Sequence, residues 1–99
     1  MAETIIKEIA AQFTLTEEQV VTEGMKAFLY DQLHLFEAEH QFILAKYNVN
    51  SCAELDSFMT SHPDQESDIL PDLQRLDFLA SRLKEIKKLL GELHGNGQS

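Results

Sequence analysis

The sequence contains no tryptophan, and it has only one cysteine, two prolines and four glycines. All-β domains place Gly- and Pro-rich turns at intervals of about 8–12 residues, so this scarcity favours helices. The single Cys52 cannot form a disulfide within the chain. We interpret it as a small buried apolar side chain in a reducing compartment.

Long apolar runs are also missing. None exceeds the four residues at positions 42–45, whereas a helix needs roughly 20 apolar residues to cross a bilayer. The first residues show no basic segment followed by an apolar stretch, the pattern of a secretory signal. We therefore expect a cytoplasmic protein with no membrane partner.

Basic residues are few. Eight Lys and Arg oppose 17 Asp and Glu, which gives a net charge of −9 and a pI near 4.7. This charge repels nucleic-acid phosphates and anionic lipid, and it attracts basic partners. Five of the eight cations lie in the last third of the chain: Arg75, Arg82, Lys84, Lys87 and Lys88. We expect a basic protein partner rather than a nucleic acid.

Helical periodicity predicts four helices, over about residues 4–13, 17–47, 52–60 and 70–93. Thr14 or Thr16 can cap the second helix, Asn48 can end it, and Ser51 can cap the third. Residues 61–68 form a polar linker, and Pro71 suits the first turn of the last helix. The 99 residues are predicted to form a single helical domain over residues 1–94, with a disordered tail at 95–99.

Both long helices carry an apolar stripe with steps of three and four residues. The stripe of the second helix consists of Met25, Leu29, Leu33, Phe36, His40, Ile43 and Tyr47. The stripe of the last helix consists of Leu76, Leu79, Leu83, Ile86, Leu90 and Leu93, a heptad pattern typical of coiled coils.

The sequence therefore predicts an all-α fold in which the two long helices form an antiparallel hairpin with two short helices beside it. Further apolar residues, such as Val21, Phe28 and Phe42, lie off the stripe of the second helix. Because one facing helix cannot cover them, we predict a homodimer with a four-helix core, and the two stripes are the expected core and dimer interface.

Candidate catalytic and metal-binding motifs are sparse. Glu37 and His40 form one E-x-x-H, a pairing that binds iron or manganese in ferritin-like bundles. Such a site also needs inward carboxylates from another helix, and the facing stripe is wholly Leu and Ile. We find no nucleophile motif and no Gly-rich phosphate loop. The prediction is a protein that is not an enzyme and has no cofactor.

Residues 15–29 read LTEEQVVTEGMKAFL, and residues 46–51 read KYNVNS, ahead of a Leu-rich last helix. This order of elements resembles small acidic helical antitoxin-like proteins of prokaryotes. The resemblance implies a partner that folds over a basic toxin. The helical periodicity and single cation, Lys7, of the first segment differ from the DNA-reading strand of ribbon-helix-helix antitoxins.

Three functions follow from these patterns. The leading hypothesis is a non-catalytic, homodimeric interaction protein that neutralises a basic protein, steered by acidic side chains and anchored near Phe28, Tyr30 and Leu35. The acidic side chains are Glu3, Glu8, Glu17, Glu18, Glu23 and Asp31. There are two alternatives. One is a DNA-binding transcriptional regulator, namely an antitoxin that acts on its own operator, and the other is a small di-metal helical bundle that uses the E-x-x-H.

Overall fold

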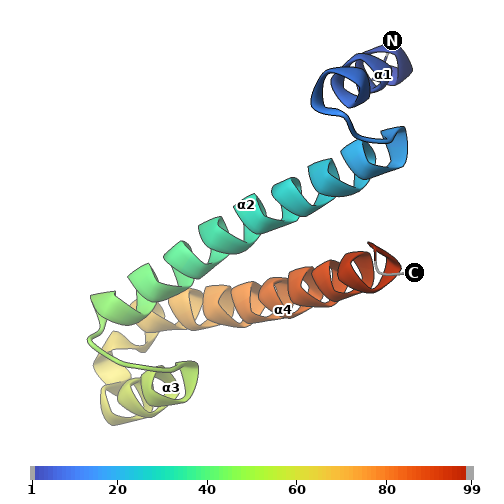
Figure 1. Ribbon diagram of the computed structural model, residues 1–99. Helices are drawn as coiled ribbons and strands as arrows, with labels where there is room; N and C mark the ends of the chain where they lie inside the picture. The colour runs from blue at the N-terminus through green and yellow to red at the C-terminus, as the bar shows by residue number, and fades with distance from the viewer. Residues whose placement is uncertain (1, 98–99) are drawn as a thin grey trace.

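The structure, a computed structural model, describes residues 2–97, and within this range the chain forms helices and no strand (Figure 1). The elements are α1 (Ala2–Phe13), α2 (Glu17–Lys46), α3 (Cys52–Ser61), the 3₁₀ turn η1 (Pro63–Gln65) and α4 (Glu66–Gly97). The all-α prediction is therefore confirmed. None of these helices combines the length and apolarity that a membrane span requires.

Local hydrogen bonds set both ends of α2. At its start, the Gln19 backbone N–H donates to Thr16 Oγ1 (3.0 Å), and the Thr16 N–H donates to Gln19 Oε1 (2.8 Å). This is a capping box. At its end, Asn48 adopts a left-handed φ of 54°, and the Val49 N–H donates to the Leu44 carbonyl (3.1 Å). This Schellman arrangement ends the helix where the sequence placed the stop.

α2 and α4 form the predicted antiparallel hairpin. They meet beside α3 and diverge toward the start of α2 and the end of α4 (Figure 1). The core lies at the α3 end and comprises Ile43, Leu44, Leu55, Ile69, Leu76 and Leu79. Leu55 from α3 is fully buried among the residues of the two long helices, so α3 closes this end of the hairpin.

Two boundaries differ from the predictions. The segment 61–68, predicted as a linker, contains the end of α3, η1 and the first turn of α4, so α4 begins at Glu66 rather than at residue 70. Pro63, not Pro71, opens the helical segment, and the fully buried Ile69 anchors the added turn in the core. Burial of such a side chain stabilises by about 1.5–3 kcal/mol, which offsets the amide hydrogen bond that Pro71 cannot make.

The predicted disordered tail at 95–99 is partly helical, since α4 continues to Gly97. Glycine in a helix costs only about 1 kcal/mol, so a long helix can extend into these residues. Residues 98 and 99 lie outside the described part of the chain.

The chain is elongated, with extents of 61 × 27 × 18 Å and a radius of gyration of 19.6 Å. A folded domain of this length has a radius of gyration of about 13 Å. The accessible surface is 7248 Å², compared with about 5,700 Å² for a typical folded monomer of this mass. The hairpin thus leaves an unusually large surface in contact with solvent.

Candidate interaction surface

The predicted stripes of α2 and α4 face each other inside the hairpin. Of these residues, Ile43, Leu76, Leu79, Ile86 and Leu90 are buried. Leu29, Leu33, Phe36, His40, Tyr47, Leu83 and Leu93 are half-buried. Met25, near the start of α2, is 44% exposed because the two helices have diverged there.

A second apolar row runs along α2 outside the hairpin seam. It consists of Val21, Phe28, Leu35 and Phe42, whose exposed fractions are 43, 62, 64 and 72%. Residues seven apart lie on the same side of a helix, so these four side chains form one line. We call them the α2 row. The seven-residue spacing was visible in the sequence, but the prediction named Phe28 and Leu35 as anchors and Val21, Phe28 and Phe42 as surplus apolar residues, without joining the four into one row.

Val21 and Phe28 of the α2 row line a groove between α2 and α4. Two adjoining hollows, of about 570 and 390 Å³, share Phe28, Leu29 and Leu89 in their walls. The remaining wall residues are Val21, Gly24, Met25, Gln32, Phe36, Phe78, Arg82, Glu85, Ile86, Glu92 and Leu93. We call this the open groove, and its larger hollow lies where the helices diverge. Phe78 and Leu89 are 42 and 38% exposed, and the sequence analysis did not single them out.

Cationic side chains frame the Phe78 end of the open groove. The guanidinium carbons of Arg75 and Arg82 lie 4.8 and 5.5 Å from the centre of the Phe78 ring. Arg75 also donates through Nη2 to Glu39 Oε1 (2.8 Å), and this hydrogen bond holds the pKa of Glu39 below its usual value. Phe78 itself packs edge-on against Phe36, with ring centres 6.5 Å apart. The Phe78 ring is therefore held by contacts within the chain itself.

α1 is a second exposed apolar element. Only Ala10 is buried, whereas Ile5, Ile9 and Phe13, which lie four residues apart, are 56, 39 and 68% exposed. Side chains at this spacing form one stripe on a helix. α1 packs chiefly on α2 and points away from α4 (Figure 1).

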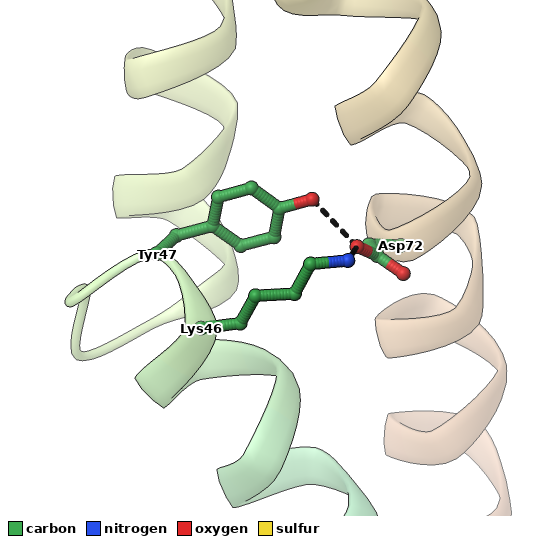
Figure 2. A network of polar contacts seen from close by, with 3 residues as sticks. All are labelled: Lys46, Tyr47 and Asp72. Atoms are coloured by element: carbon green, nitrogen blue, oxygen red, sulfur yellow. Dashed lines mark hydrogen bonds and ion pairs between the residues drawn. The ribbon is translucent and has the colours of Figure 1, made fainter.

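A polar network ties the end of α2 to the start of α4 (Figure 2). Tyr47 Oη donates to Asp72 Oδ2 (2.5 Å), and Lys46 Nζ donates to the same oxygen (2.8 Å). The hydrogen bonds from Lys46 and then Tyr47 lower the pKa of Asp72. Burial, followed by the bond to Asp72, raises the pKa of Tyr47. A phenol with a raised pKa is a poor proton donor in acid–base chemistry, and we describe the network as a structural clasp because it joins α2 to α4.

The candidate metal and nucleophilic residues lie apart from the open groove. Glu37 is exposed and His40 is half-buried on α2. No group of three His, Cys, Asp or Glu side chains that could hold a metal occurs within residues 2–97. Cys52 Sγ lies 3.7 Å from Asp77 Oδ1, and burial, followed by the charge of Asp77, raises the pKa of the thiol. A thiol in this state is a weak nucleophile at neutral pH.

The acidic side chains that the sequence analysis proposed for steering are all exposed. Glu3 and Glu8 lie on α1, and Glu17, Glu18, Glu23 and Asp31 lie on the first half of α2. Phe28, Tyr30 and Leu35, the proposed anchors, are exposed as well, at 62, 39 and 64%. Tyr30 also hydrogen bonds to His94 Nε2 of α4 (3.2 Å).

Together these features define an acidic helical-hairpin protein that carries an exposed apolar groove. The chain belongs to the Uncharacterized protein MJ0235 family, whose model matches residues 1–98. It is similar to Uncharacterized protein MJ0235 of Methanocaldococcus jannaschii, with 31% identity over 77 residues, which cover 78% of this chain and 94% of the relative. No solved structure matches the chain significantly.

Proposed function

We propose that the protein is a non-catalytic interaction protein that acts as a homodimer, with the open groove and the α2 row of one copy packed against a second copy. The observation that carries this proposal is the surface that one chain leaves exposed. It exceeds that of a typical monomer of this mass by roughly 1,500 Å². A standard protein interface buries about 800 Å² on each partner, so pairing would remove a large part of the excess.

The α2 row supports the same proposal. Its members repeat every seven residues along the 30-residue helix α2, the spacing of a coiled-coil seam. Phe28, Leu35 and Phe42 are each more than 60% exposed, and this line of large apolar side chains would gain by leaving water in an interface. Two hairpins paired along this side would form a four-helix core.

An experiment on the α2 row tests the homodimer. Sedimentation velocity across a dilution series should give a dimer for the wild-type chain. Phe28→Glu should weaken association about a hundredfold or more, because it would bury an unpaired charge. Gln41→Glu is the matched control: this residue is also exposed on α2 but lies off the row, so the variant should remain dimeric. A wild-type chain that stays single at high concentration would overturn the proposal.

The finer proposal concerns the partner of this dimer. The acidic first half of α2, with Glu17, Glu18 and Glu23 exposed, suits a basic cytoplasmic protein, as in an antitoxin that neutralises a toxin. The net charge of −9 supports long-range attraction to such a protein.

Co-expression with a small basic protein encoded beside the gene tests this pairing. The two proteins should copurify, and raising the salt concentration should slow their association. Reversing Glu17 and Glu18 to Lys should lower the association rate, whereas the same change at Asp64 and Glu66, at the opposite end of the hairpin, should leave it nearly unchanged. Failure of the basic neighbour to copurify at low salt would count against the finer proposal while leaving the homodimer intact.

A further inference from the structure

The direction of pairing and the occupant of the larger hollow follow from where the exposed apolar surfaces lie. The larger hollow, whose walls come from residues 21–29 of α2 and 89–93 of α4, lies at the same end of the hairpin as α1. The α1 stripe of Ile5, Ile9 and Phe13 is itself exposed. The opposite end of the hairpin is filled by α3 and the core.

We propose that two copies pair in parallel and that the α1 helix of each docks in the larger hollow of its partner; this inference rests on the homodimer proposed above. In a two-fold arrangement, parallel pairing places both α1 helices at the end where both hollows lie. Antiparallel pairing would instead bring each α1 helix to the α3 end of its partner, where the core closes the hairpin.

The dimensions of the stripe and the hollow agree. The α1 stripe from Ile5 to Phe13 spans eight residue steps, or about 12 Å of helix. The α2 wall of the hollow from Val21 to Leu29 also spans eight residue steps, again about 12 Å. The hollow is lined almost wholly by apolar side chains, with Glu92 the charged exception among the wall residues. It therefore offers a surface on which Ile and Phe side chains gain by leaving water.

The connector between α1 and α2 explains why a chain does not fill its own hollow. Thr14 adopts a left-handed φ of 57°, and the Leu15 N–H donates to the Ala10 carbonyl (2.9 Å), which locks the end of α1. The capping box of Thr16 and Gln19 follows immediately. Folding α1 back over the hollow would break these bonds, whereas docking against a second copy leaves them intact.

Disulfide cross-linking between singly substituted chains tests the placement. All chains carry Cys52→Ser, so each has one thiol. A chain with Ile9→Cys is mixed with a chain that carries Leu89→Cys in the groove wall. Parallel docking should cross-link this pair about tenfold faster, or more, than the pair of Lys7→Cys with Leu89→Cys, because docking raises the effective concentration of the facing thiols. Lys7 is exposed on the other side of α1.

The remaining outcomes separate this inference from the homodimer itself. Leu70 lies at the α3 end of α4. If Ile9→Cys cross-links faster with Leu70→Cys than with Leu89→Cys, the pairing is antiparallel and the inference is overturned. A dimer that forms without cross-linking Ile9→Cys to Leu89→Cys above the Lys7 control would also overturn it, while leaving self-association in place. A chain that sediments as a monomer would overturn both proposals.

A second measurement does not depend on thiol chemistry. Ile9→Ser changes a side chain that one chain leaves 39% exposed, so the hairpin should keep its helix content. The dimer dissociation constant should rise about tenfold or more, since the partner no longer buries this side chain. Lys7→Ser should change the constant little. Equal effects of the two substitutions would contradict docking through the α1 stripe.

Discussion

Tyr47 and Lys46 both hydrogen bond to one oxygen of Asp72, and we predict that the tyrosine contributes more to stability. Hydrogen bonds to charged groups contribute about 1.5–3 kcal/mol when sheltered. The Asp72 side chain is 24% exposed, so we expect a coupling of only about 1 kcal/mol between Tyr47 and Asp72 after solvent screening. Lys46 is 53% exposed, and water screens its ion pair more strongly.

Two double-mutant cycles measure these couplings. One combines Tyr47→Phe with Asp72→Ala, and the other combines Lys46→Met with Asp72→Ala. Free energies of unfolding come from urea titrations followed by circular dichroism at a single protein concentration, because association would otherwise shift the apparent stability. A coupling to Asp72 that is larger for Lys46 than for Tyr47 would refute this reasoning, as would a Tyr47 coupling below about 0.3 kcal/mol.

The same clasp predicts a pH dependence at both extremes. The folded-state pKa of Asp72 is lowered by its bonds from Lys46 and Tyr47, so its stabilisation is present above the unfolded pKa, near pH 4, and is lost as the pH falls further. The folded-state pKa of Tyr47 is raised by burial and by Asp72, so its stabilisation is present below about pH 10 and is lost at higher pH. In urea titrations at a series of pH values, Asp72→Ala should reduce the fall in the free energy of unfolding at acid pH. Tyr47→Phe should reduce its fall at alkaline pH.

Three further predictions concern the core, a strained residue and the cysteine. Leu76→Ala should lower the free energy of unfolding, measured in urea, by about 2–5 kcal/mol, because Leu76 is fully buried. Leu70→Ala, on the exposed side of α4, should lower it by less than about 1 kcal/mol, and similar losses for the two variants would contradict the packing of α4. Thr14→Gly should raise the free energy of unfolding by about 0.5–1 kcal/mol. Glycine removes the strain of the left-handed conformation, and this gain exceeds the loss from the greater conformational freedom of glycine in the unfolded chain. A lower melting temperature would argue against this backbone geometry. Burial and Asp77 raise the pKa of Cys52, so Asp77→Asn should speed its alkylation by iodoacetamide at pH 8, and an unchanged rate would remove Asp77 as a cause.

The hairpin was predictable because its signals are local. The stripe from Leu76 to Leu93 repeats with the period of a helix, and Asn48 marks a stop because Asn tolerates the left-handed conformation that it adopts. The start of α4 was predicted wrongly because Pro71 fits the first turn of a helix, while Pro63 fits the same role eight residues earlier. Only the burial of Ile69 shows which proline opens the helical segment.

The open groove was less predictable because it depends on how far two helices diverge. That angle is set at the α3 end, where Leu55 packs between segments distant in sequence. The clasp of Tyr47 and Asp72 likewise joins residues 25 apart in the sequence, and no local pattern reports such a pairing. Val21 and Phe28 could be identified as surplus apolar residues, but their position in the wall of a groove could not.

The location of the core at the α3 end determines how the hairpin moves. Leu55, Ile69, Leu76 and Leu79 are completely buried there, whereas near the end of α4 the two long helices are joined by the exposed hydrogen bond between His94 and Tyr30, which lies midway along α2. Backbone amides should therefore exchange with deuterated water slowly near α3 and progressively faster toward the tips. Because the helices of the hairpin are long, we expect a small change of the angle between α2 and α4 at the core to change the width of the open groove much more than the packing around Leu55.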